Sequence, residues 1–293
     1  MTLQQVASKL EERTGLTAFV HAVDIDHGRE TGIRAEESVV SASVFKVPVL
    51  VEACRQIAAG EIDPTQQIHL GTEDYRVLGY TGIAAFCDPV TLSFRDLCLS
   101  MMQVSDNRAT DAVMNILGLE SITVTLAELS FTHTVLEGDC AHLFATMWED
   151  LAELGYGEIQ TFREAGESLL QLRALDPKQA NRSTPKETSA LFSMLWRQES
   201  LDPTACAEAR RILEQQAWSH RLSSGFPDDE ISTCGKTGTL PYIRNEAGVV
   251  EYPDGGRYAV SVFLRLPTSA SAVPHFDAAI GILAAAAVDE LRS

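Results

Sequence analysis

Two kinds of hydrophobic pattern occupy different parts of the chain. Positions that alternate, or form short apolar runs bounded by turn residues, predict strands, and apolar positions spaced three and four apart predict helices. Strand patterns occur towards both ends, at 17–24, 30–35, 231–237, 245–252 and 257–266. Helical patterns cover 1–15, 44–59, most of 92–218 and about 276–291.

This distribution predicts an α+β fold. Strands from both chain ends form one antiparallel sheet flanked by the terminal helices, with an inserted all-helical lobe. We expect a sheet domain of residues 1–38 plus 222–293 and a helical domain of residues 39–221. A cleft between two such lobes is a usual place for an active site, so the site is expected there.

Charge and hydropathy restrict the partners. The 293 residues carry a formal net charge of −18, which disfavours nucleic acid and anionic membrane surfaces as partners. No apolar run of membrane-spanning length is found, so no membrane span is expected. Residues 1–15 lack the features of a signal peptide, which predicts a cytoplasmic protein as written, or a secreted one if a leader was removed before residue 1.

Cysteine and histidine spacing gives no sign of a metal site. The six cysteines include no CxxC pair, and the seven histidines form no cluster with ligand spacing. We therefore expect no metal and no cofactor, and mostly buried reduced thiols. A bridge between Cys54 and Cys98 stays open.

The first candidate for chemistry is Ser43-Val44-Phe45-Lys46, at the start of the helical pattern 44–59. Residues three apart share a helix face, so Lys46 is expected one turn above the Ser43 hydroxyl. A lysine whose pKa is lowered by burial and nearby cations can act as the base that a serine nucleophile needs. The helix start also offers free N–H groups, including that of Ser43, to a developing oxyanion.

The same spacing recurs in Ser183-Thr184-Pro185-Lys186, where a structural explanation is better. Thr184 fits an N-cap, Pro185 the first helical position, and Glu187 would complete a capping box.

The second candidate is Ser105-Asp106-Asn107, after an apolar helical run. Ser105 can relay a proton between a lysine and a leaving nitrogen, and Asn107 can hydrogen-bond a substrate amide. The alternative is a simple cap for the helix beginning near Arg108, a task that Asp106 could perform while its neighbours face the cleft.

The third candidate is Lys236-Thr237-Gly238, at the end of a strand pattern. Lys236 and Thr237 can hold a substrate carboxylate, and Gly238 lets a substrate backbone lie against the strand edge. The backbone N–H of residue 238 or of Thr239 is a candidate second oxyanion donor. The alternative is an ordinary strand end.

These three elements, in this order, are the signature of class A β-lactamases and penicillin-binding proteins, and the chain resembles that superfamily along nearly its whole length. Segments 41–48, 81–83, 105–110 and 235–240 are similar to family segments. The resemblance implies an acyl-enzyme on Ser43, formed with β-lactams or D-alanyl peptides without a cofactor. It also implies that Arg244 binds the substrate carboxylate beside Lys236 and Thr237.

One family element is not matched. Class A enzymes have an ExxLN loop whose glutamate activates the water that breaks the acyl-enzyme. The nearest match is 167–171, which makes Glu167 the candidate base, although it lies in an amphipathic helical pattern. Counting from Asn107 instead places the loop near 136–139. Other carboxylates compete for the role: Glu137, Glu158, Glu164 and Asp176.

Three functions follow from these observations. The first is a β-lactamase-like serine hydrolase that opens β-lactam amides. The second is a D-alanyl carboxypeptidase or esterase. The third is a slow-turnover penicillin-binding protein that is acylated once and reports the ligand, because rapid turnover needs a second base. In each reading the partner is a small-molecule substrate and the protein is expected to be a monomer.

Overall fold

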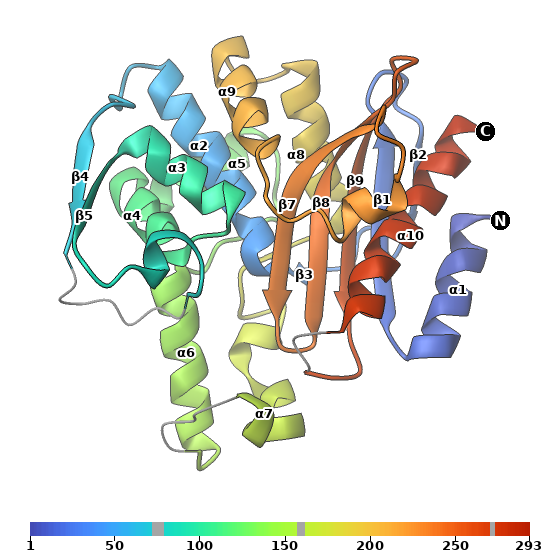
Figure 1. Ribbon diagram of the computed structural model, residues 1–293, viewed down its shortest axis with the longest axis horizontal. Coiled ribbons are helices and arrows are strands. Elements are labelled where there is room, and N and C mark those ends of the chain that lie inside the picture. The colour runs from blue at the N-terminus through green and yellow to red at the C-terminus, as the bar shows by residue number, and fades with distance from the viewer. Residues whose placement is uncertain (72–78, 157–161, 270–272) are drawn as a thin grey trace.

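A five-stranded antiparallel sheet forms the centre of the structure (Figure 1). The computed structural model describes residues 1–71, 79–156, 162–269 and 273–293. The order across the sheet is β2-β1-β9-β8-β7. The strands are β1 (Thr17–Asp24), β2 (Glu30–Ile33), β7 (Ser232–Leu240), β8 (Ile243–Glu251) and β9 (Arg257–Arg265). The prediction that both chain ends build one sheet is confirmed.

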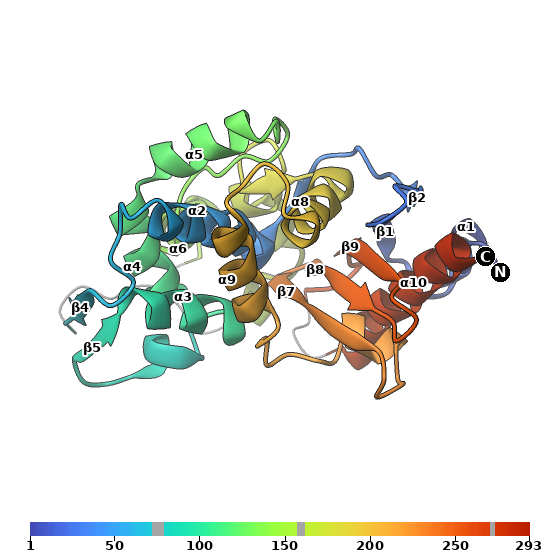
Figure 2. The ribbon, with the colours of Figure 1, turned by 90° about the horizontal axis from the view of Figure 1, so that it is seen from above.

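The sheet is covered by helices on both faces, and this explains the apolar runs in its strands. Ala247 and Val249 on β8 face a cluster formed with the central helices, whereas Val250 faces the terminal helices. The termini meet on that second face, where the Leu3 N–H donates to Glu290 at 2.8 Å. Figure 2 shows the terminal helices α1 (Leu3–Thr14) and α10 (Pro274–Arg292) on the opposite side of the sheet from α8 (Pro185–Arg197).

The stretch between β2 and β7 is mainly helical, as predicted, and it also contains two small two-stranded sheets. Its α-helices besides α8 are α2 (Lys46–Ala58), α3 (Phe94–Gln103), α4 (Asn107–Leu117), α5 (Leu119–Glu128), α6 (Cys140–Glu153), α7 (Phe162–Ala165) and α9 (Pro203–Leu213). The small sheets pair β3 (Val39–Val40) with β6 (Arg182–Ser183) and β4 (Gln67–Leu70) with β5 (Val90–Ser93). Short 3₁₀ segments are η1 (Ala42–Phe45), η2 (Gly82–Ala85), η3 (Gly166–Gln171), η4 (Arg173–Leu175) and η5 (Leu222–Gly225).

The two lobes share one hydrophobic core. The largest cluster joins Phe19 and Phe263 of the sheet to Leu50 and Leu195 of the helices. The boundaries at residues 38/39 and 221/222 stay a prediction, because the packing is continuous across them.

The structure also tests several smaller predictions from the sequence. Cys54 and Cys98 are buried free thiols, so the bridge left open by the sequence is not formed, and Cys87 is exposed. Thr184 caps α8 by accepting from the Glu187 N–H at 3.0 Å, as predicted. The Glu187 carboxylate instead accepts from the His133 N–H at 2.9 Å.

Within the described ranges, no helix has both the length and the apolar character needed to cross a membrane.

Asp106 ties three helical segments together. Its carboxylate accepts from the N–H groups of Arg108 and Ala109 at 3.0 and 3.1 Å, which caps α4. It also accepts from the Ile83 N–H at 2.6 Å and the Ser100 hydroxyl at 2.7 Å. The side chain is fully buried, so these donors depend on it.

We expect Asp106→Ala to lower the free energy of unfolding by about 3 kcal/mol, because buried donors lose their acceptor and α4 loses its cap. Urea denaturation measures the change. Glu12→Ala, which removes an exposed carboxylate from α1, serves as the control and should change stability by less than about 0.5 kcal/mol. A loss below 1 kcal/mol for Asp106→Ala would contradict this role.

Candidate active site

Ser43 lies in the 3₁₀ segment η1, which continues directly into α2. The preceding Ala42 has a positive φ of 45°, a conformation that L residues adopt only under constraint. The Ser43 side chain is half-buried, and its hydroxyl makes no hydrogen bond to any residue that the structure describes. The hydroxyl is therefore free to react.

The sheet holds the segment that carries Ser43. The side-chain amide of Asn245 on β8 donates to the carbonyls of Val40 and Ser41 at 3.0 and 3.1 Å. On β7, a Cβ added to Gly238 would lie 2.8 Å from the Ser41 carbonyl oxygen. A side chain at Gly238 would therefore push the nucleophile segment off the sheet.

Lys46 occupies the first position of α2, one turn after Ser43, and is completely buried. Its Nζ donates to the Ser105 carbonyl at 2.9 Å, to the Ser105 hydroxyl at 3.3 Å and to Asn107 Oδ1 at 2.8 Å. Burial lowers the pKa of Lys46, and the negative charge of groups around it, Asp106 and Asp111 among them, partly opposes that change. A lysine with a lowered pKa is closer to the neutral amine that can accept a proton.

The turn between α3 and α4 presents its groups to Lys46 through an unusual backbone. Ser105 has a φ of 60°, in the left-handed region, and this brings both its carbonyl and its hydroxyl to the same ammonium group. Asp106 turns away to cap α4, and Asn107 turns back to Lys46. The structure thus shows a helix cap at Asp106, while Ser105 and Asn107 on either side of it contact Lys46.

Lys236 is the second buried lysine of the site. Its Nζ donates to the Thr237 carbonyl at 2.9 Å. Burial lowers its pKa well below the ordinary value, and the positive charges of Lys46 and Arg221 lower it further. Lys236 therefore lies within electrostatic reach of Lys46, which itself contacts Ser105 and Asn107.

The pairing of β7 indicates which of the two candidate N–H groups points to its free edge. The Thr237 N–H donates to Gln216 Oε1 at 2.7 Å, on the edge that is not paired with β8. Backbone groups of an antiparallel strand alternate between its two edges, so the Thr239 N–H points to the same free edge. Of the two candidates, Thr239 is therefore the strand residue placed to serve as an oxyanion donor.

Arg244 is buried. Its guanidinium donates to the carbonyls of Leu240 and Ile243 at 3.1 and 2.8 Å. Its Nε lies 3.8 Å from Asp277. Burial lowers its pKa, as does the positive charge of Arg221. The substrate-binding role that the resemblance implies for Arg244 stays a prediction.

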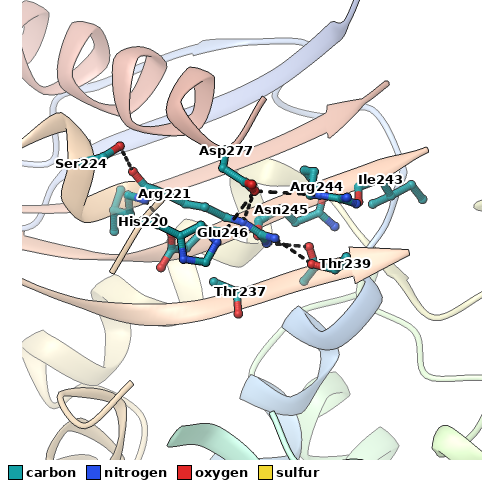
Figure 3. Close-up of polar contacts among 12 residues, drawn as sticks. His220, Arg221, Ser224, Thr237, Thr239, Ile243, Arg244, Asn245, Glu246 and Asp277 are labelled. Carbon is teal, nitrogen blue, oxygen red and sulfur yellow. Dashed lines mark hydrogen bonds and ion pairs between the residues drawn. The ribbon is translucent and has the colours of Figure 1, made fainter. Parts of the chain in front are cut away.

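Arg221, which sequence reasoning missed, lies beside Arg244 and reaches further. Figure 3 shows it extended across β7 and β8 between Asp277 and Thr239. It donates to Thr239 Oγ1 at 2.8 Å, to the carbonyls of Gly238 and Asn245 at 3.0 Å, and to Asp277 at 2.7 Å. No short motif marks it, because its place depends on how the loop before η5 folds back over β7.

Lys46, Lys236 and Arg221 are buried and interact electrostatically, and the described residues include no group of three or more His, Cys, Asp or Glu arranged to hold a metal. Sequence comparison now adds to this geometry. The chain matches the model of the Beta-lactamase enzyme family over residues 2–291.

The chain belongs to that family.

Its relatives include enzymes and a regulator. It is 28% identical over 305 residues to the β-lactamase regulatory protein BlaB of Streptomyces cacaoi, covering 99% of this chain and 97% of that protein. Its fold is similar to an ancestral class A β-lactamase, with a TM-score of 0.78, 22% identity and coverage of 99% and 100%. A mutant of PBP-A, solved as its acyl-enzyme with penicillin G, has a TM-score of 0.76, 17% identity and coverage of 99% and 96%. Family and fold together support a β-lactamase-like serine hydrolase.

Among the described residues, no candidate carboxylate for the second base bonds to Lys46. Glu167 lies in η3 with an exposed side chain, and in the described part of the chain it makes no hydrogen bond or ion pair. Glu137 pairs with Arg182, and Asp176 accepts from Gln179 at 2.9 Å. Glu164 is exposed, and Glu158 lies outside the described residues. The role of Glu167 stays a prediction.

Sequence reasoning also missed Cys140. This residue contacts Asn107, the same side chain that binds Lys46. Its Sγ lies 3.4 Å from Asn107 Oδ1, and it begins α6. Asp111 accepts from the backbone N–H groups of Cys140 and Ala141 at 2.8 and 3.1 Å. Burial raises the pKa of Asp111 to about 7, and the charge of Asp139 raises it as well.

This pKa predicts a pH-dependent stability. Folded Asp111 binds its proton more tightly than unfolded Asp111, so the free energy of unfolding should fall as the pH rises from about 4 to about 7. Asp111→Asn lacks that titration, so its stability relative to wild type should rise over this range by up to about 4 kcal/mol. Urea denaturation of both proteins at several pH values measures this. A difference that does not change with pH would contradict the prediction.

Proposed function

We propose that this protein opens β-lactam amides with Ser43 and becomes acylated there. The observation that carries the proposal is the hydrogen-bonded group of Lys46, Ser105 and Asn107, with Lys46 one helical turn after Ser43, whose hydroxyl bonds to none of the described residues. A buried lysine of lowered pKa beside a free hydroxyl is an arrangement that activates a serine.

The chemistry follows from these positions. Ser43 Oγ attacks the lactam carbonyl carbon and gives its proton to Lys46 as the neutral amine. The N–H groups of Ser43 and Thr239 stabilise the oxyanion that develops. The carbon–nitrogen bond then breaks, and Ser105, which lies 3.3 Å from Lys46 Nζ, passes the proton to the leaving nitrogen. The product of this half-reaction is an ester of Ser43.

A carboxylate next to the reacting ring is the substrate feature that this site favours. Lys236, Arg221 and Arg244 are buried cations near the exposed Thr239. Arg221 already donates to the hydroxyl of the exposed Thr239, so its guanidinium lies beside the free edge of β7. Arginine binds carboxylates through two parallel hydrogen bonds, which makes Arg221 the preferred partner and Arg244 a supporting charge.

Slow release of the acyl group is the second candidate property, and one observation favours it. No carboxylate in the described ranges forms an ion pair or hydrogen bond with Lys46, and Glu167 lies at the surface. A relative named as a regulatory protein and a PBP-A mutant solved as an acyl-enzyme fit a protein that keeps its ligand. A D-alanyl peptide or an ester would be opened by the same groups.

The direct test is intact mass after incubation with penicillin G, together with turnover of a chromogenic cephalosporin. Wild type should gain one penicillin. Ser43→Ala should gain none, and Lys46→Ala should be acylated at least about 100-fold more slowly, because it lacks the base. Lys186→Ala, in the other SxxK segment, is the matched control and should behave as wild type. Labelling of Ser43→Ala would refute the proposal.

A second experiment tests how the carboxylate is bound. Arg221→Ala should lower the second-order acylation rate of a carboxylate-bearing β-lactam by about 10- to 100-fold, because a charge-assisted hydrogen bond is lost. The rate with an uncharged acyl ester should fall much less. Arg244→Ala should have the smaller effect of the two. Equal losses with both substrates would show a structural role for Arg221 instead.

A further inference from the structure

Cys140 faces the same oxygen atom that binds the catalytic lysine. Asn107 Oδ1 accepts from Lys46 Nζ at 2.8 Å and lies 3.4 Å from Cys140 Sγ. The Cys140 side chain is 2% exposed, so it closes this side of the site against solvent. The position next to Lys46 and Asn107 is thus filled by a sulfur atom.

The backbone at Cys140 is fixed from two directions. Asp111, one turn after Asn107 on α4, accepts from the Cys140 and Ala141 N–H groups. On the other side, Asn181 Oδ1 accepts from the N–H groups of Glu137 and Gly138 at 2.7 and 3.2 Å. Because the backbone of Cys140 is fixed, the identity of the side chain at position 140 decides which group faces Lys46.

A thiol at this position cannot serve as a base. Burial raises the pKa of Cys140 to about 12, although Lys46 lowers it, so the group is a neutral thiol near pH 7. The two nearby carboxylates, those of Asp106 and Asp111, already accept hydrogen bonds. Asp106 accepts four hydrogen bonds in its cap, and both oxygens of Asp111 accept backbone N–H groups.

We propose that Cys140 determines the lifetime of the acyl-enzyme, by holding a group that cannot activate water where a carboxylate would act. This inference rests on the proposed acylation of Ser43. Acylation uses Lys46 and Ser105 and does not need position 140, whereas hydrolysis of the ester needs a base beside the water.

The step that Cys140 restrains is ordinary ester hydrolysis. A water oxygen bonds to the acyl carbonyl carbon and gives one proton to a base, and the bond from that carbon to Ser43 Oγ breaks. The proton then goes to Ser43 Oγ, and the penicilloic acid leaves. No oxidant, reductant or cofactor takes part.

The test compares Cys140→Asp with Cys140→Asn, which have nearly the same shape but differ in basicity. Each protein is acylated with penicillin G, freed of excess ligand and followed by intact mass. The adduct of the Asp variant should disappear at least about tenfold faster than that of the Asn variant. Its rate should rise with pH until the new carboxyl is ionised, whereas the rate of the Asn variant should not.

Equal lifetimes for the two folded variants would overturn the inference, as would a wild-type adduct that disappears within seconds. A wild type that neither forms an adduct nor turns over the chromogenic cephalosporin would instead refute the proposed function. Hydroxylamine on the wild-type adduct provides a measurement that does not depend on folding of a variant. Hydroxylamine attacks the ester without the help of a protein base, so it should shorten the adduct lifetime at least about tenfold. An adduct that resists it is shielded from attack, which would also overturn the inference.

Discussion

The site depends on one buried charge. Lys46 has no exposed surface, and removing an ammonium group from water is costly unless hydrogen bonds replace its hydration. Those bonds come from Ser105 and Asn107, so α2 and the turn before α4 cannot move apart without leaving the charge unsolvated. The left-handed backbone of Ser105 is held in place by the same requirement. Lys46, Ser105 and Asn107 therefore form one hydrogen-bonded unit.

The cations around this unit act on the lysines and on the substrate together. Lys46, Lys236, Arg221 and Arg244 are all buried; desolvation lowers the pKa of both lysines, and the charges of Lys46 and Arg221 lower that of Lys236 further. Glu246 offsets part of this charge, and burial raises its own pKa to about 6. The field that favours a neutral lysine thus also attracts an anionic ligand to the free edge of β7.

Much of this could be predicted from the sequence, because the relevant signals are local. The apolar patterns located the five sheet strands within a few residues, and the spacing of Ser43 and Lys46 follows from helix geometry. Arg221 and Cys140 could not be predicted, because each reaches the site through a fold-back of the chain that no short pattern encodes. The prediction for Glu167 rested only on the partial match of its neighbours to ExxLN, and in the structure η3 leaves its side chain at the surface.

The clamp between Asn245 and the carbonyls of Val40 and Ser41 has a consequence for how ligands reach Ser43. It joins the reactive loop to the interior of the sheet, so the two lobes have no hinge between them at this point. On the open border of β7, the Thr237 N–H is bonded to Gln216, whereas Thr239 is exposed. A ligand that bonded to Thr239 and reacted with Ser43 would therefore lie alongside β7 like an added strand, an arrangement that suits a peptide-like amide.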